Sequence, residues 1–194
     1  MANANAPRGL SPVRGVSSEY VTGGPREYVH DSGDGTALYV GDPVKLAGDS
    51  TVVNGVSLPQ VIRASTGDVI VGVVVGALPE TRDSLPYVAA NTTRRVLVDD
   101  DPNSLFEVQD ANGGTQLTTA AVGLNVDFTG TGGTAATGFS AVTLSNTTEA
   151  GTNTLDLKII DVVNRVDNDP TATGPLRFLV RINRHQHANQ VAGV

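Results

Sequence analysis

Short apolar segments separated by turn residues run through the chain from Thr36 onward. In 176–183, LRFLVRIN, every second residue is apolar, which is the pattern of a half-buried strand. The run VIVGVVVGAL at 69–78 is about half the roughly 20 residues that a membrane-spanning helix needs, and it predicts a buried strand. Only 155–165, LDLKIIDVVNR, also fits a helical face, and its β-branched residues favour a strand.

The turns between these segments predict the fold class. Asn54-Gly55 lies between two valines, and both residues tolerate the positive φ of a tight hairpin turn. Further turn signals follow at short, regular intervals, at 41–43, 48–49, 66–67 and 112–114. This spacing predicts an all-β protein with little helix, either a jelly-roll-like β-sandwich or a β-barrel.

The chain divides into three parts by composition. Residues 1–30 lack apolar periodicity and predict an extended N-terminal arm, 31–184 predict a single β domain, and 185–194 predict a C-terminal tail. Within the low-complexity region 111–154 we expect strands joined by a mobile loop at 130–138. The arm contains spaced apolar residues that we expect to dock on a partner: Val13, Val16, Tyr20, Val21 and Tyr28.

Three consecutive aspartates in 96–110, VLVDDDPNSLFEVQD, are the strongest candidate for a site. Acids or amides stand at positions 1, 3, 5 and 12 of a calcium-loop count, which makes Asp99, Asp101, Asn103 and Asp110 candidate ligands. The glycine expected at position 6 is Ser104, however, and the flanks predict strands over 95–98 and 105–109. A turn with solvated carboxylates, in which Pro102 fixes φ for a reversal, is therefore favoured over a calcium site.

Composition excludes several classes of function. The 194 residues include no Cys and no Trp, so disulfides and thiolate chemistry are ruled out. A net charge of −7 with only two lysines disfavours nucleic-acid binding. The N-terminus has no apolar core of the length that a secretory signal requires, and no membrane partner is expected.

Motifs for catalysis are also missing from the sequence. It contains no G-x-S-x-G, P-loop, S-x-x-K or H-E-x-x-H pattern. His185 and His187 have the i, i+2 spacing that places two side chains on one face of a strand, but the third histidine, His30, is far away in sequence. We therefore expect no enzyme, no cofactor and no metal, with a solvated tail around the two histidines.

Part of the chain resembles a known group of proteins. GDPVKLAG at 41–48, the VIVGVVVGAL segment and RRVLVDDDPNSLFEVQD at 94–110 resemble segments of the small decoration, or cement, proteins of tailed-bacteriophage capsids. The resemblance covers 36–110. It implies a protein that binds the outside of the shell, often as a dimer or trimer, and holds neighbouring capsomers together.

Two functions follow as hypotheses. The first is a virion structural protein, made in the host cytoplasm and located on the outer surface of the capsid. Its partners would be the major capsid protein and further copies of itself, in a homodimer or homotrimer. The alternative is a cell-surface or carbohydrate-binding β module, such as a receptor-binding head, which would use clustered exposed aromatic residues and often calcium.

Overall fold

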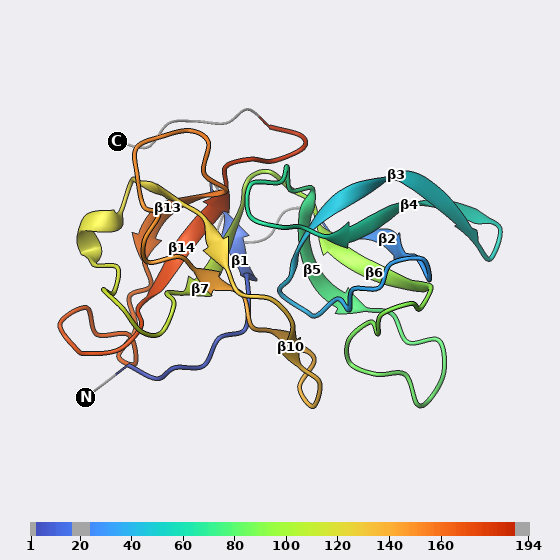
Figure 1. Cartoon of the computed structure of the whole chain (residues 1–194), viewed down its shortest axis with the longest axis horizontal. Helices are drawn as coiled ribbons and strands as arrows, with labels where there is room; N and C mark the ends of the chain where they lie inside the picture. Colours follow the sequence, from blue (N-terminus) through green and yellow to red (C-terminus); the bar gives the residue numbers. More distant parts are fainter. Residues whose placement is uncertain (1–2, 17–23, 189–194) are drawn as a thin grey trace.

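The protein consists of two β lobes arranged along one long axis (Figure 1). The structure is a computed structural model, and it describes residues 3–16 and 24–188. Strands dominate the described residues, and the one helical element is a short 3-10 helix, Thr119–Ala121. The predicted all-β class is confirmed.

The first lobe is a closed five-stranded barrel, on the right in Figure 1. Its order is β2-β4-β3-β5-β6, and β6 pairs back with β2 in antiparallel register. Alternating valines on these strands fill the interior, where Val44, Val61 and Val96 are fully buried. The strands are β2 (Arg26–His30), β3 (Pro43–Val53), β4 (Val56–Arg63), β5 (Gly72–Ala77) and β6 (Arg94–Asp99).

The second lobe is built on a five-stranded sheet in the order β1-β7-β14-β13-β8, with two small two-stranded sheets beside it. Phe106 and Phe178 are fully buried in its core, which also takes in Phe128 and Leu144 from one of the small sheets. The strands are β1 (Ser11–Gly15), β7 (Ser104–Gln109), β8 (Asn125–Val126), β9 (Phe128–Thr129), β10 (Gly133–Thr134), β11 (Phe139–Ser140), β12 (Thr143–Leu144), β13 (Leu157–Val162) and β14 (Arg177–Ile182).

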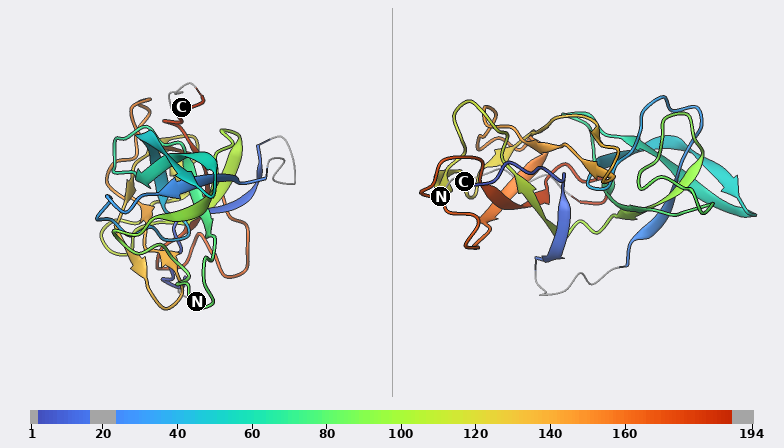
Figure 2. Two further views of the ribbon diagram at one scale, coloured as in Figure 1. Left: turned by 90° about the vertical axis from the view of Figure 1, so that its right-hand side faces the viewer. Right: turned by 90° about the horizontal axis from the view of Figure 1, so that it is seen from below.

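Several segments hold the lobes together. The loop between β4 and β5 contributes Ala64 and Ile70 to the core of the sheet lobe. The β10–β11 hairpin reaches the barrel lobe, where Phe139 forms a parallel bridge with Val40. The N-terminal segment also crosses the junction, because the Leu10 N–H donates to the Gly41 carbonyl at 2.9 Å. Figure 2 shows the barrel and the sheet lobe from two further directions.

The sequence-based division of the chain differs from the structure. Residues 3–16 and 24–30 are not a free arm: β1 pairs with β7, and β2 closes the barrel. The expected single β domain over 31–184 contains two separate apolar cores. The expected tail begins with His185, which is buried and bridges to Ile70. The proposed loop at 130–138 includes β10 and packs against the barrel lobe.

Candidate functional site

The acidic segment is a crossover between the lobes. β6 ends at Asp99 in the barrel, and β7 begins at Ser104 in the other sheet, so the predicted strands form but the expected chain reversal between paired neighbours is wrong. Asp99 is buried and accepts from the Ser104 hydroxyl at 3.0 Å. Burial raises the pKa of the Asp99 carboxyl, and the Ser104 bond opposes that shift.

Asp100 ties the crossover to strand β2. Its Oδ2 accepts from the Tyr28 hydroxyl at 2.8 Å and from Arg26 Nη1 at 2.9 Å. Burial first, and then the bond to Asp100, raise the pKa of Tyr28 to about 12. These carboxylates therefore act as hydrogen-bond acceptors for the chain itself and not as a purely solvated loop.

The calcium candidates do not converge. Asp110 lies beyond the far end of β7 from the crossover, where its Oδ2 accepts from the Leu117 N–H at 2.9 Å. Asp101 accepts instead from the N–H of Asn103 at 2.8 Å. Within residues 3–16 and 24–188, no three His, Asp or Glu side chains gather closely enough to hold a metal ion. The four residues whose spacing imitates a calcium loop are therefore separated by the extended strand β7.

The two C-terminal histidines share one local structure. Nδ1 of His185 accepts from the His187 N–H at 3.0 Å, so the ring of neutral His185 carries its proton on Nε2. Burial, followed by the neighbouring His187, lowers the pKa of His185 to about 4. His185 is therefore a neutral core residue near physiological pH.

The residues expected to bind a partner fall into three groups. Val13 and Val16 remain accessible, each 45% exposed, on or next to the edge strand β1. Tyr28 is 2% exposed and belongs to the barrel core, so its expected role as a partner anchor is wrong in this structure. Tyr20 and Val21 lie outside the described residues.

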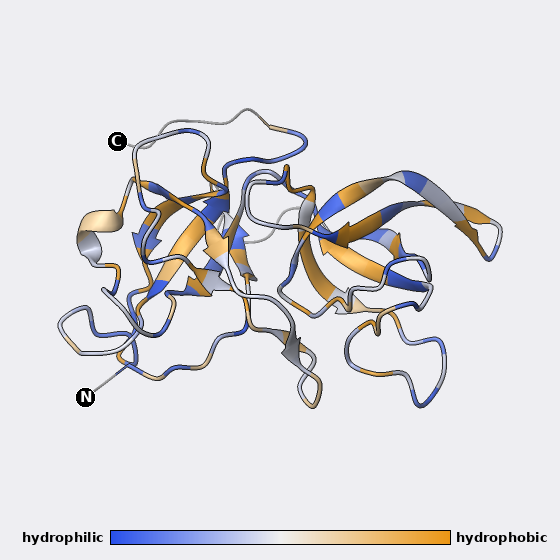
Figure 3. Cartoon of the chain, viewed as in Figure 1, coloured by the Kyte–Doolittle hydropathy of each residue, from blue (hydrophilic) through white to orange (hydrophobic). Residues whose placement is uncertain are grey.

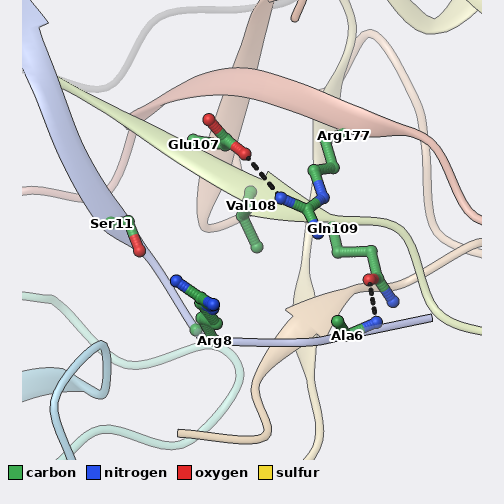
Figure 4. Close-up of a pocket in the computed structure, with 8 residues that line it drawn as sticks. Ala6, Arg8, Ser11, Glu107, Val108, Gln109 and Arg177 are labelled. Carbon is green, nitrogen blue, oxygen red and sulfur yellow. Dashed lines mark hydrogen bonds and ion pairs between the residues drawn. The ribbon is translucent and has the colours of Figure 1, made fainter. Parts of the chain in front are cut away.

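A small polar cavity lies between the N-terminal segment and strands β7 and β14 (Figure 4). Glu107 Oε1 accepts from Arg177 Nη1 at 3.1 Å, and Gln109 Oε1 accepts from the Ala6 N–H at 2.8 Å. Arg8 stands at the same cavity, with its guanidinium 5.3 Å from the centre of the Phe139 ring. The volume of about 30 Å³ holds about two waters, well below the roughly 300 Å³ of a small-molecule pocket. The cavity is therefore suited to water molecules that hydrate the hydrogen-bonded side chains around it.

Buried aspartates mark the contacts between the lobes, and sequence reasoning missed them. Asp42 in the barrel lobe accepts from the Ser140 hydroxyl of the β10–β11 hairpin, and burial raises its pKa to about 6. Asp156 beside β13 accepts from the Gly67 N–H at 3.1 Å, and burial followed by the charge of Asp127 raises its pKa to about 7. In the sequence, Gly41-Asp42-Pro43 indicates only a turn. Asp42 differs from a solvated aspartate through its hydrogen bond with Ser140, which forms only in the folded protein.

Comparisons with known proteins add no identification. No family model, no curated protein and no solved structure matches the chain. In the described part of the chain no helix has the length and apolarity to cross a bilayer.

Proposed function

We propose that the chain is a virion structural protein that decorates an assembled capsid. The observation that carries the proposal is the outer edge of β1, where Val13 and Val16 are each 45% exposed and no strand of the described residues pairs on the outer side. Isolated exposed valines are ordinary, but two of them at a free sheet edge can contribute both apolar contact and strand-like hydrogen bonds to a partner. The partner in this proposal is the major capsid protein.

The mechanism needs binding and no chemistry. A protein that binds the assembled lattice and not its free subunits stabilises the assembled state by its binding free energy. Weak contacts repeated over one shell stabilise it further, because each bound copy acts on the same assembly. The resemblance of 36–110 to capsid decoration proteins supports the same proposal.

The aromatic residues weigh against the carbohydrate-binding alternative. Tyr39 and Tyr87 stack on each other with ring centres 4.7 Å apart, and Tyr28 is buried. Three of the four Phe residues, Phe106, Phe128 and Phe178, are buried as well. Tyr39, Tyr87 and Phe139 are half-buried, so none of the Tyr and Phe side chains among the described residues is fully exposed as a platform for a sugar.

The proposal is tested by binding to shells that lack this protein. Removal of residues 2–28 would also remove β1 and most of β2, so point substitutions are the better test. We expect Val13→Ser combined with Val16→Ser to weaken binding by about tenfold or more, because two apolar contacts are lost. Co-sedimentation or microscopy of decorated shells measures this.

Val166→Ser is the matched control, because Val166 is fully exposed in a loop of the same lobe and is not at the β1 edge. It should bind like the unaltered protein. Undecorated shells with unaltered protein would overturn the proposed function, and full binding by the double variant would overturn the β1 edge as the contact surface.

A further inference from the structure

The β3–β4 hairpin projects well beyond the barrel, at the right of Figure 1 and in the right-hand view of Figure 2. β3 pairs with β5 only at Pro43 and Val44, and β4 pairs with β2 only at Gln60. Beyond these points each strand has one neighbour among the described residues, namely the other strand of the hairpin. The distal hairpin is therefore a two-stranded ribbon with two free edges.

The register determines which backbone groups point outward. Asn54 and Gly55 form a two-residue turn with φ of 52° and 81°, and the Val53–Val56 pair closes it. Because hydrogen-bonded and non-hydrogen-bonded pairs alternate, the next pair, Val52 with Ser57, turns its N–H and C=O groups outward. The pair of Ser50 with Pro59 does the same.

The two edges differ in what they can bind. On the β4 edge, Pro59 has no N–H, and this proline blunts the edge against a further strand. On the β3 edge, Val52 presents both of its backbone groups and Ser50 presents its carbonyl, while the Ser50 N–H donates locally to Asp49 at 2.7 Å. The β4 edge presents the corresponding groups, the N–H and carbonyl of Ser57 and the carbonyl of Pro59, but there the proline ring fills the space that an incoming strand needs. The β3 edge is therefore the more open of the two to strand addition.

The side chains on the ribbon favour a second copy of the same chain as the partner. Val52 is 69% exposed and Val56 is 57% exposed, and Figure 3 shows hydrophobic colouring near the far end of the hairpin. From 46 to 58 the only charged residue is Asp49, whereas 17% of the residues in the whole chain are charged. Two copies that each carry a net negative charge repel each other, and a ribbon with few charged side chains is where they can approach.

We propose that two copies of this protein associate through the β3 edge, in antiparallel register about Thr51, to form a continuous four-stranded sheet. In this register the Val52 N–H of each copy donates to the Ser50 carbonyl of the other. The contact uses the same surface on both copies, so it closes as a two-fold dimer. The blunted β4 edge prevents the sheet from growing into a fibre. Only the role of this dimer on a capsid rests on the proposed function. The dimer itself is measured on purified protein, without a capsid.

Single cysteines test the register, since the chain has no other cysteine. At the centre, Thr51 faces the second copy's Thr51 in a non-hydrogen-bonded pair, with Cα atoms about 4.5 Å apart, within the range that a disulfide spans. We expect Thr51→Cys to oxidise to a covalent dimer. Ser57→Cys, which is exposed on the β4 edge, is the matched control and should remain mostly monomeric under the same conditions. Equal cross-linking of both variants, or none at Thr51→Cys, would overturn the proposed register.

Light scattering over a wide concentration range tests the edge itself. The unaltered protein should approach twice the mass of one chain as its concentration rises. Val52→Pro removes the outward N–H without removing a bond inside the hairpin, and we expect it to remain a monomer. Ser57→Pro removes the equivalent N–H from the β4 edge and should still dimerise. A monomeric unaltered protein, or loss of the dimer in both variants, would overturn the proposal.

Discussion

At the residue scale, the structure separates carboxylates that the sequence presents as equivalent. Asp101 and Asp99 are two positions apart, yet one accepts bonds within an exposed turn and the other is buried against Ser104. The sequence favoured solvated carboxylates over a calcium site for this segment, whereas in the structure Asp99 is buried and Asp100 accepts from Tyr28 and Arg26. It could not identify Asp42 or Asp156, because their partners are 98 and 89 residues away in the chain.

Ser140 is expected to be important for stability because of its partner. Its hydroxyl donates to buried Asp42 and accepts from the Val142 N–H at 3.1 Å. Ser140→Ala leaves a buried carboxylate oxygen without that donor, and we expect the free energy of unfolding to fall by about 1–3 kcal/mol. Denaturant titration measures this. Thr137→Ala, an exposed position in the same hairpin, should change it far less, and equal losses for both variants would contradict the argument.

At the element scale, local patterns predicted strands well and their partners poorly. The Asn54-Gly55 hairpin, a strand within 155–165 and the alternation from Leu176 to Ile182 are all confirmed, the second as Leu157–Val162. In 111–154 the expected strands shrink to two-residue pairs and a 3-10 helix, because Thr, Gly and Ala provide few large side chains to bury. β6 and β7 belong to different sheets because of packing between segments that are distant in the sequence. The periodicity of apolar residues does not predict such packing.

Two glycines of β5 offer a matched test of close packing. A Cβ on Gly72 would overlap the Asp99 carbonyl oxygen and approach Val98 Cγ1 to 2.7 Å, whereas one on Gly76 finds its nearest neighbour, Leu97 Cδ1, at 3.9 Å. We expect Gly72→Ala to destabilise the barrel by about 1–3 kcal/mol and Gly76→Ala to be nearly neutral. Thermal unfolding of the two variants is the measurement, and a neutral Gly72→Ala would show that β5 and β6 are farther apart than described.

At the scale of the whole molecule, the junction between the lobes should be sensitive to pH. Asp156 links β13 to the loop at Gly67, with Asp127 and Arg184 as the neighbouring charges. Its pKa of about 7 in the folded protein lies above the usual 3.8, so the folded state holds a proton that the unfolded state releases. Stability from this group is present at low pH and is lost as the pH rises through about 7.

Because the unfolded state releases this proton above about pH 4 and the folded state releases it only near pH 7, we expect Asp156 to lower the stability of the protein as the pH rises from about 4 to about 7. The pKa of His185 is lowered to about 4 in the folded protein, so this residue raises the stability as the pH rises. It does so only below 6.5, the usual pKa of histidine. Asp156→Asn keeps a carbonyl oxygen for Gly67 and removes the charge. Its melting temperature should fall less over this interval than that of the unaltered protein, and identical pH profiles would contradict the raised pKa.

The order of the strands along the chain also affects how the protein is made. The sheet lobe takes β1 from residues 11–15 and its other strands from residue 104 onward, so the whole barrel sequence lies between two parts of the same sheet. During synthesis, all five barrel strands leave the ribosome before the partners of β1 do. We expect the barrel to fold first on the nascent chain. The outer edge of β1, which we propose as the contact with the capsid, would then be completed last, once β7 and β14 have been synthesised.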